Sequence, residues 1–174
     1  MARKSDNARG NEQIDKGVVP EGFTLGLALV DALPVVLFCL ACVVAGLRLH
    51  STVFVVGAVV AFIGGAGKVG WKLVIALAHR NVPWLSRQMR VVMPAGFALM
   101  LVGLLTSGLD GSRLLAAVTV FPTWAFLVLW VICMCGMGWF AGHLDPTDAR
   151  SNWIEQLTNA CGQAALLAAL LLMP

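Results

Sequence analysis

Lys68 and Lys72 are the residues of this chain whose positions most strongly suggest chemistry. Both lie inside the apolar run of residues 64–79, GGAGKVGWKLVIALAH, which belongs to a segment long enough to cross a bilayer. A lysine near the centre of a spanning helix costs about 2.5–3.5 kcal/mol on insertion scales, so an intramembrane lysine marks a functional site by default. Ion pairing, ligand binding and proton transfer are the chemistries open to such a group.

Amide side chains near the C-terminus form a second candidate group. Four of them recur at the spacing i, i+4, i+7 and i+11, which places them on one face of a helix. Glu155 lies at the edge of this stripe, whose members are Asn152, Gln156, Asn159 and Gln163. Lys68, Lys72, Ile75 and His79 repeat the same spacing and are expected to share a face of their own helix.

The composition indicates that these groups are carried by membrane-spanning helices. Of the 174 residues, 59% are hydrophobic and only 12% are charged, and the mean hydropathy is +0.86. About a quarter of the residues of a typical soluble domain are charged. We therefore expect an all-α integral membrane protein, with no nucleic acid as a partner despite the net charge of +3.

We expect a single transmembrane domain, residues 22–174, preceded by a polar cytoplasmic tail, residues 1–21. The apolar runs predict a bundle of five transmembrane helices, since about 17–25 residues cross the hydrocarbon core. The expected spans are residues 23–47, 52–79, 91–106, 114–142 and 152–173.

The basic residues beside the spans predict the orientation of the chain in the membrane. Four lie in the tail, three in the connector of residues 80–90 and one in the connector before the last span, whereas only two lie on the other side. Cytoplasmic loops carry the excess of lysine and arginine. The N-terminus is therefore expected in the cytoplasm and the C-terminus outside, in a multi-pass protein of the cell membrane.

Asp31 is the expected partner of the lysines. It lies eight residues from the cytoplasmic end of its span, and Lys72 and Lys68 lie seven and eleven residues from the same end of theirs. Helical residues rise by ~1.5 Å each, so the three groups lie at similar depth. We expect them to form, with the amide stripe and Glu155, a polar chamber in the cytoplasmic half of the bundle, with His79, Arg80, Arg87, Arg90 and His143 near its mouth.

Each of these features also has a structural explanation. The lysines can form an ion pair with Asp31, or Lys72 can extend to the interface. The amides can serve as interhelical hydrogen bonds. Small residues at four-residue spacing, Gly57, Ala61 and Gly65 in one span and Gly138 and Gly142 in another, favour close helix packing.

Other site types are disfavoured. The string GGAGKVG lacks the first glycine and the Ser or Thr of a phosphate-binding loop. His79 and His143 are the weak candidates for a metal or haem, and we expect no metal and no cofactor. The five cysteines lie in apolar segments, where thiolates are disfavoured.

The sequence thus favours a protein that binds and transports a small polar or anionic ligand through the polar chamber. One alternative is a membrane-embedded enzyme acting on a lipid or isoprenoid head group, although no catalytic motif supports it. The other is a structural or assembly subunit of a larger membrane complex. Membrane lipids are the expected surroundings, and a homodimer or a partner subunit is possible because five spans are few for a transporter acting alone.

Overall fold

The structure, a computed structural model, describes residues 24–108, 111–145 and 147–173, together with Glu12, Lys16 and Val19. These residues form helices and no strand, which confirms the all-α class. The expected tail, residues 1–21, otherwise lies outside the described residues. The helices are α2 (Leu25–Leu49), α3 (Thr52–Ala78), α4 (Pro83–Leu105), α5 (Gly111–Thr119), α6 (Thr123–His143) and α7 (Ala149–Leu172).

Local sequence signals set the ends of the long helices. The side chains of Thr24, Ser51 and Asp148 accept hydrogen bonds from the first turns of α2, α3 and α7, the capping role in which these residue types are preferred. Helices α2 and α3 end at His50 and His79, whose left-handed backbone conformation (φ 47° and 48°) returns their N–H groups to the last turn.

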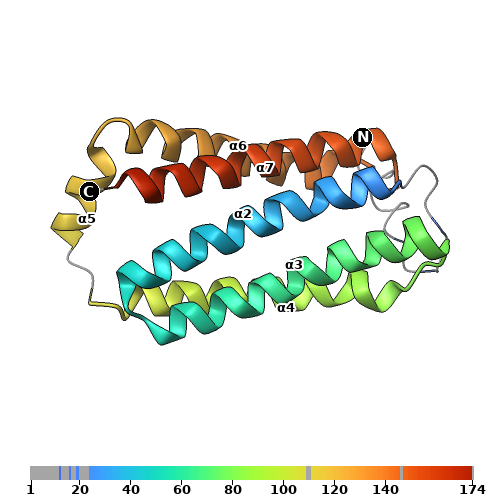
Figure 1. Cartoon of the computed structure of the whole chain (residues 1–174), viewed down its shortest axis with the longest axis horizontal. Helices are drawn as coiled ribbons and strands as arrows, with labels where there is room; N and C mark the ends of the chain where they lie inside the picture. Colours follow the sequence, from blue (N-terminus) through green and yellow to red (C-terminus); the bar gives the residue numbers. More distant parts are fainter. Residues whose placement is uncertain are drawn as a thin grey trace.

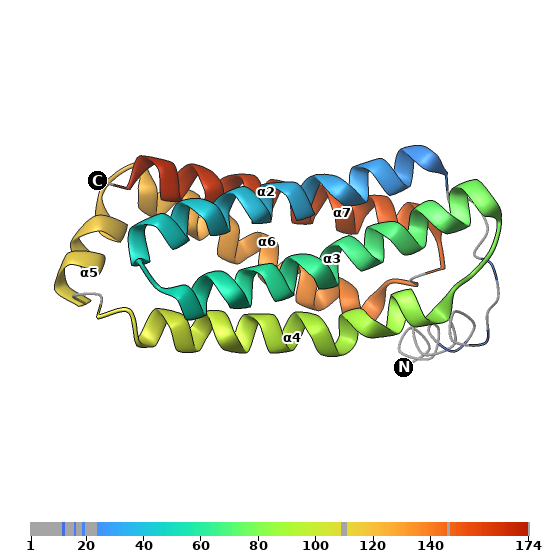
Figure 2. The same ribbon diagram turned by 60° about the horizontal axis from the view of Figure 1, so that its bottom comes forward.

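The five long helices run back and forth between the same two ends of the molecule (Figure 1). Neighbours in the packing follow the order α4, α3, α2, α7, α6, so that α2 joins the α3–α4 hairpin to the α6–α7 hairpin. The short α5 lies at one end and packs on α6. Figure 2 shows from a second direction that the long helices run between the same two ends, with α6 behind α2 and α3 in that view. Helices α4 and α6 thus each have one main packing partner.

Small residues bring α3 and α4 close together. A Cβ atom added to Gly96 of α4 would lie 2.5 Å from the backbone nitrogen of Ala61, and one added to Gly57 of α3 would lie 2.5 Å from that of Met100. Gly103 is in similarly close contact with Phe54. Close backbone approach at small residues is the usual way in which membrane helices associate. The expected packing role of Gly57 and Ala61 is therefore confirmed.

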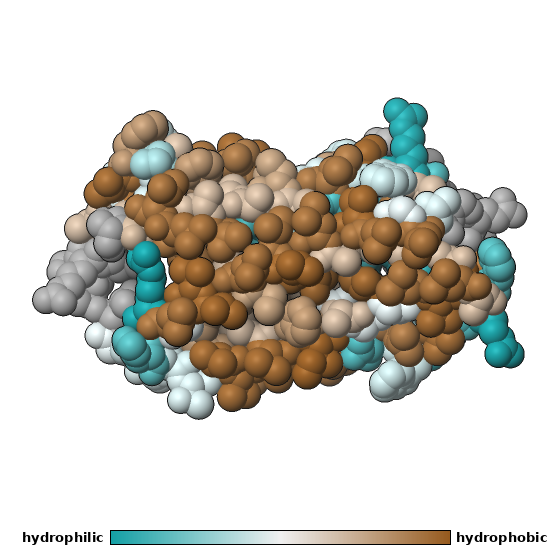
Figure 3. Space-filling model, viewed as in Figure 1, coloured by the Kyte–Doolittle hydropathy of each residue, from teal (hydrophilic) through white to brown (hydrophobic). Residues whose placement is uncertain are grey.

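Four helices in the described part of the chain, α2, α3, α4 and α6, are long and apolar enough to cross a membrane. Helix α7 is not among them, because its first half carries the amide stripe and Glu155. Figure 3 shows apolar residues covering the middle of one face, with hydrophilic residues gathered at its two ends. This distribution is typical of a membrane protein.

Two expected spans have different limits in the structure. Helix α4 begins at Pro83 rather than at residue 91, because proline is favoured in the first helical turn, so most of the basic connector is helical. The expected span of residues 114–142 is divided into α5 and α6 by Val120–Pro122. Proline lacks the N–H that a continuous helix requires at that position.

The expected close packing of Gly138 and Gly142 is wrong. A Cβ atom added at either position would meet nothing within 4 Å among the described atoms. Both glycines lie on an exposed side of α6, so the four-residue spacing there carries no helix contact.

Candidate functional site: a buried polar cluster of three helices

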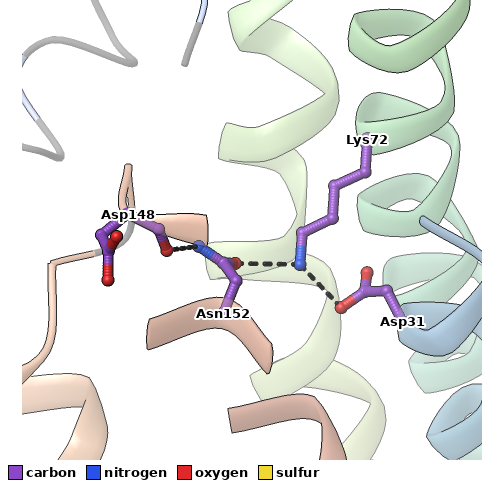
Figure 4. A network of polar contacts seen from close by, with 4 residues as sticks. All are labelled: Asp31, Lys72, Asp148 and Asn152. Atoms are coloured by element: carbon purple, nitrogen blue, oxygen red, sulfur yellow. Dashed lines mark hydrogen bonds and ion pairs between the residues drawn. The ribbon is translucent and has the colours of Figure 1, made fainter. Parts of the chain in front are cut away.

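Lys72, Asp31 and Asn152 meet at the junction of α3, α2 and α7. The Lys72 Nζ atom donates to Asp31 Oδ1 at 2.9 Å and to Asn152 Oδ1 at 3.0 Å (Figure 4). The Asn152 amide in turn donates to the backbone carbonyl of Asp148 at 2.9 Å. The three side chains are 1%, 2% and 4% exposed, so the cluster is almost completely buried.

Packing on the neighbouring turns fixes Lys72 in this position. Trp71 and Ile75 of α3 form a buried apolar core with Leu27 of α2, and Leu85 of α4 packs against it. The indole N–H of Trp71 donates to Asn81 Oδ1 at 2.8 Å, which ties the end of α3 to the following connector. Because Leu27 and Asp31 are four residues apart, they share a face of α2, and the apolar contact aligns the carboxylate with Lys72.

Lys68 and Glu155 lie beside the cluster. Both are half-buried, and Glu155 is close enough to Lys68 and Lys72 to interact with them electrostatically. Gln156, one turn beyond Asn152, is 2% exposed. Two acidic and two basic side chains therefore gather in one part of the bundle, as expected, and Asp31 pairs with Lys72 rather than with the more exposed Lys68.

Two buried oxygen atoms, one on α2 in the cluster and one farther along α7, have no hydrogen-bond partner among the described residues. One is Asp31 Oδ2, in the ion pair itself, and the other is Gln163 Oε1. The Gln163 amide nitrogen lies 3.3 Å from Asn159 Oδ1 and 3.9 Å from the sulfur of Met134 in α6. Buried polar atoms nearly always have a partner, so both acceptors call for a donor from water or from a ligand.

The residues expected at the mouth lie at the end of the bundle nearest the cluster, where α3 and α6 end and α4 begins (Figure 1). His79, Arg80, Arg87, Arg90 and His143 are all exposed. His79 ends α3 in a left-handed backbone conformation and is exposed, whereas Lys72 and Ile75 are buried. The ring of His143 stacks on Trp139, with 4.5 Å between the centroids, and its Nδ1 lies 2.8 Å from the Trp139 carbonyl oxygen.

Two cavities between the helices do not coincide with the expected polar chamber. One, of about 300 Å³, lies between α2 and α3, and the other, of about 720 Å³, is lined mainly by α2, α4 and α7. Both are apolar, and neither includes a member of the polar cluster. Lys72 contacts both Asp31 and Asn152, and all three side chains are almost completely buried, so the cluster is closed to solvent.

The described side chains do not form a cluster of metal-binding residues. Among them, no three His, Cys, Asp or Glu residues lie close enough to hold a metal ion. The cluster itself supplies a carboxylate that accepts, an ammonium group that donates, and amides that do both.

Two features of this region are not evident from the sequence pattern. Asn81 lies in a loop, and nothing in its spacing indicates that it accepts from Trp71. Met134 contacts Gln163 only because α6 and α7 pack in this register. The large apolar cavity and the contact of Arg48 with the Met173 carbonyl also depend on helix packing, so the sequence pattern does not reveal them. A basic residue at the less basic end of a span is nevertheless unusual, and it marks Arg48 in the sequence.

Comparisons of the chain with protein-family models, with curated proteins and with solved structures give no significant match.

Proposed function

We propose that this chain is a five-span membrane protein that binds and transports a small polar ligand, anionic or zwitterionic, through the polar faces of α3 and α7. The single observation that carries the proposal is the unpartnered Asp31 Oδ2 inside a nearly fully buried cluster of three helices. A purely structural ion pair would be expected to satisfy both carboxylate oxygens, because an unpaired buried acceptor costs about 1–3 kcal/mol.

The arrangement of charges favours this ligand class. A ligand ammonium or hydroxyl group would donate to Asp31 Oδ2, and a ligand carboxylate or phosphate would pair with Lys68. Glu155 and the stripe of Gln156, Asn159 and Gln163 offer further donors and acceptors deeper in the bundle. Gln163 is eleven residues, or about 16 Å, from Asn152 along α7, so the unpartnered acceptors mark two levels of a path.

The basic residues support a cytoplasmic entrance. Arg80, Arg87, Arg90 and Arg150 lie at the end of the bundle nearest the cluster, and Arg48 lies at the other end. In this proposal α7 is the fifth crossing, the N-terminus and the entrance face the cytoplasm, and the C-terminus lies outside. A net-positive entrance attracts anionic ligands. Because five spans are few for a transporter acting alone, transport requires a second copy or a partner subunit.

Mass spectrometry of small molecules retained by the purified protein tests the proposal. Lys68→Ala removes a half-buried charge that is not part of the Lys72–Asp31 ion pair, so the variant is expected to fold. The wild-type protein should retain a polar compound that Lys68→Ala loses by about tenfold, the change expected for one charge-assisted interaction.

Lys16→Ala is the matched control, since Lys16 is an exposed lysine outside the bundle that pairs with Glu12 at 2.6 Å. It should retain the compound at the wild-type level. Equal retention by Lys68→Ala and the wild-type protein would refute the proposed site.

A further inference from the structure

The cavity of about 720 Å³ lies in the half of the bundle opposite the polar cluster. Its walls come mainly from α2, α4 and α7, with Ala45, Met100, Leu104 and Leu166 among the lining residues, and α6 contributes Trp130. Pockets that bury most of a small ligand measure about 300–1,000 Å³. The cavity is therefore large enough for a ligand, and its apolar lining requires an occupant that is apolar along most of its length.

The position of the cavity gives it access to lipid. Helices α4 and α6 form the two edges of the helix layer, and each has one main packing partner, α3 and α7 respectively. Both helices are apolar enough to span a membrane and expose most of their large side chains. The cavity is partly open, and in a bilayer the exposed apolar side chains of α4 and α6 face hydrocarbon, so an acyl chain can enter from the side.

Two polar groups of the cavity lining distinguish it from a plain apolar surface. Arg48, in the last turn of α2, is exposed, and its Nη2 atom donates to the Met173 carbonyl oxygen at 3.0 Å. A guanidinium group has five N–H donors, so it can bind an anion in addition to this contact. The indole Nε1 of Trp130 is buried and has no hydrogen-bond partner among the described residues.

We propose that this cavity binds an anionic phospholipid, with an acyl chain between α4 and α6 and the phosphate at Arg48. The arginine lies at the end of the bundle, where the head groups of the bilayer begin, and Arg–phosphate pairs are among the strong charge-assisted contacts. An acceptor on the lipid would also satisfy the Trp130 N–H. The site is independent of the polar cluster and of the ligand proposed for it.

Native mass spectrometry of the full chain tests this proposal. The protein is incubated with equal amounts of dioleoyl phosphatidylglycerol and dioleoyl phosphatidylcholine, which share acyl chains and differ in net charge. Wild-type protein should retain phosphatidylglycerol in preference, and Arg48→Gln should reduce that preference about tenfold. Arg150→Gln, at an exposed arginine of the other end, should leave it unchanged.

A second pair of variants tests the cavity itself. Ala45→Phe fills part of the apolar lining and should reduce retention of both lipids, whereas Leu40→Phe, at an exposed position of the same helix, should not. Soluble glycerol phosphate should not displace the lipid, because the acyl chain supplies much of the binding. Equal retention of the two lipids by the wild-type protein would overturn the proposal, and so would displacement of the lipid by glycerol phosphate. A protein dimer that Ala45→Phe dissociates would also overturn it, because a second copy of the chain would then occupy the cavity.

Discussion

At the scale of single residues, the fold depends on the pairing of Lys72 with Asp31. The distance between Lys72 Nζ and Asp31 Oδ1 is 2.9 Å, and both side chains are almost completely buried. Removing one partner of a buried ion pair costs about 3–5 kcal/mol because the other charge stays buried and unpaired, whereas removing both charges is often neutral. The stability of the protein should therefore depend on matching these two residues.

This dependence predicts the behaviour of a double-mutant cycle. Lys72→Met should lower the free energy of unfolding by about 3–5 kcal/mol, and Asp31→Asn combined with Lys72→Met should restore most of the loss. Chemical unfolding in detergent micelles, followed by circular dichroism, measures all four proteins. A double variant as unstable as Lys72→Met alone would show that the ion pair does not determine the stability of this junction.

Asp148 provides a pH-dependent test outside the apolar segments. Hydrogen bonds from the Ser151 hydroxyl and N–H groups hold the pKa of the Asp148 carboxyl below its usual value of 3.8. A lowered native pKa stabilises the folded state above pH ~4, and this contribution is lost as the pH falls through the native pKa.

Asp148→Asn keeps the cap but does not titrate. The wild-type protein should be more stable than this variant near pH 7 by about 0.3–1 kcal/mol, because a negative charge is favourable at a helix N-terminus. Thermal unfolding across pH 2–7 should show the difference disappearing in acid. A difference that stays constant over this range would exclude the ionised carboxylate as its source.

The sequence predicted which residues belong to the cluster, but it did not predict which of them pair with each other. The depth of Asp31 from the end of its span was sufficient to pair it with the lysines, because helix rise is constant. Lys68 and Lys72 share a face of α3, so spacing alone could not choose between them, and the choice depends on how far α3 is shifted along α2. That shift is set by Trp71 and Ile75 packing on Leu27, which is a tertiary effect.

At the scale of the elements, glycines determine how closely α3 and α4 approach. Gly96 lies directly against Ala61, and an added Cβ would meet its backbone at 2.5 Å. Gly96→Ala should therefore destabilise the protein by about 1–3 kcal/mol through overpacking.

Gly138→Ala is the matched control on α6, where an added Cβ meets nothing within 4 Å. This variant should be neutral or more stable by up to about 1 kcal/mol, since alanine is the better helix former. Thermal unfolding of the two variants in the same detergent compares them. Similar effects at both sites would contradict the close α3–α4 contact.

Element boundaries show where the sequence pattern fails. Hydropathy placed the start of the third span at residue 91, because Arg87 and Arg90 are polar, yet α4 begins at Pro83. The apolar character of residues 114–142 concealed the break before α6, although Pro122 was a signal for it. Hydropathy detects the apolar part of a helix, whereas prolines and caps mark its ends.

At the scale of the whole molecule, the order α4, α3, α2, α7, α6 could not be derived from the chain. Any compact arrangement of these helices fits the same composition, and the place of α4 and α6 at the two ends of the order follows from side-chain packing. The proposed orientation, however, is testable without knowledge of the packing. It depends on basic residues and on whether α7 crosses the membrane.

Reporter fusions test this orientation. A reporter inserted beside Asp145, between α6 and α7, should be active only as a cytoplasmic reporter, and one fused after residue 174 only as an external one. If both sites report the same side, α7 does not cross and the chain has four spans.

The most direct test of the proposed function is whether water and ions reach the polar cluster from the cytoplasm. Lys68→Cys, with the five native cysteines replaced by alanine, places a single thiol beside the cluster, and Ile63→Cys places one on an exposed apolar position of the same helix. A membrane-impermeant thiol reagent should modify Lys68→Cys in inside-out vesicles and not in right-side-out vesicles, and it should leave Ile63→Cys unmodified in both. Modification of Lys68→Cys from the outside alone, or from neither side, would contradict a ligand path that opens to the cytoplasm.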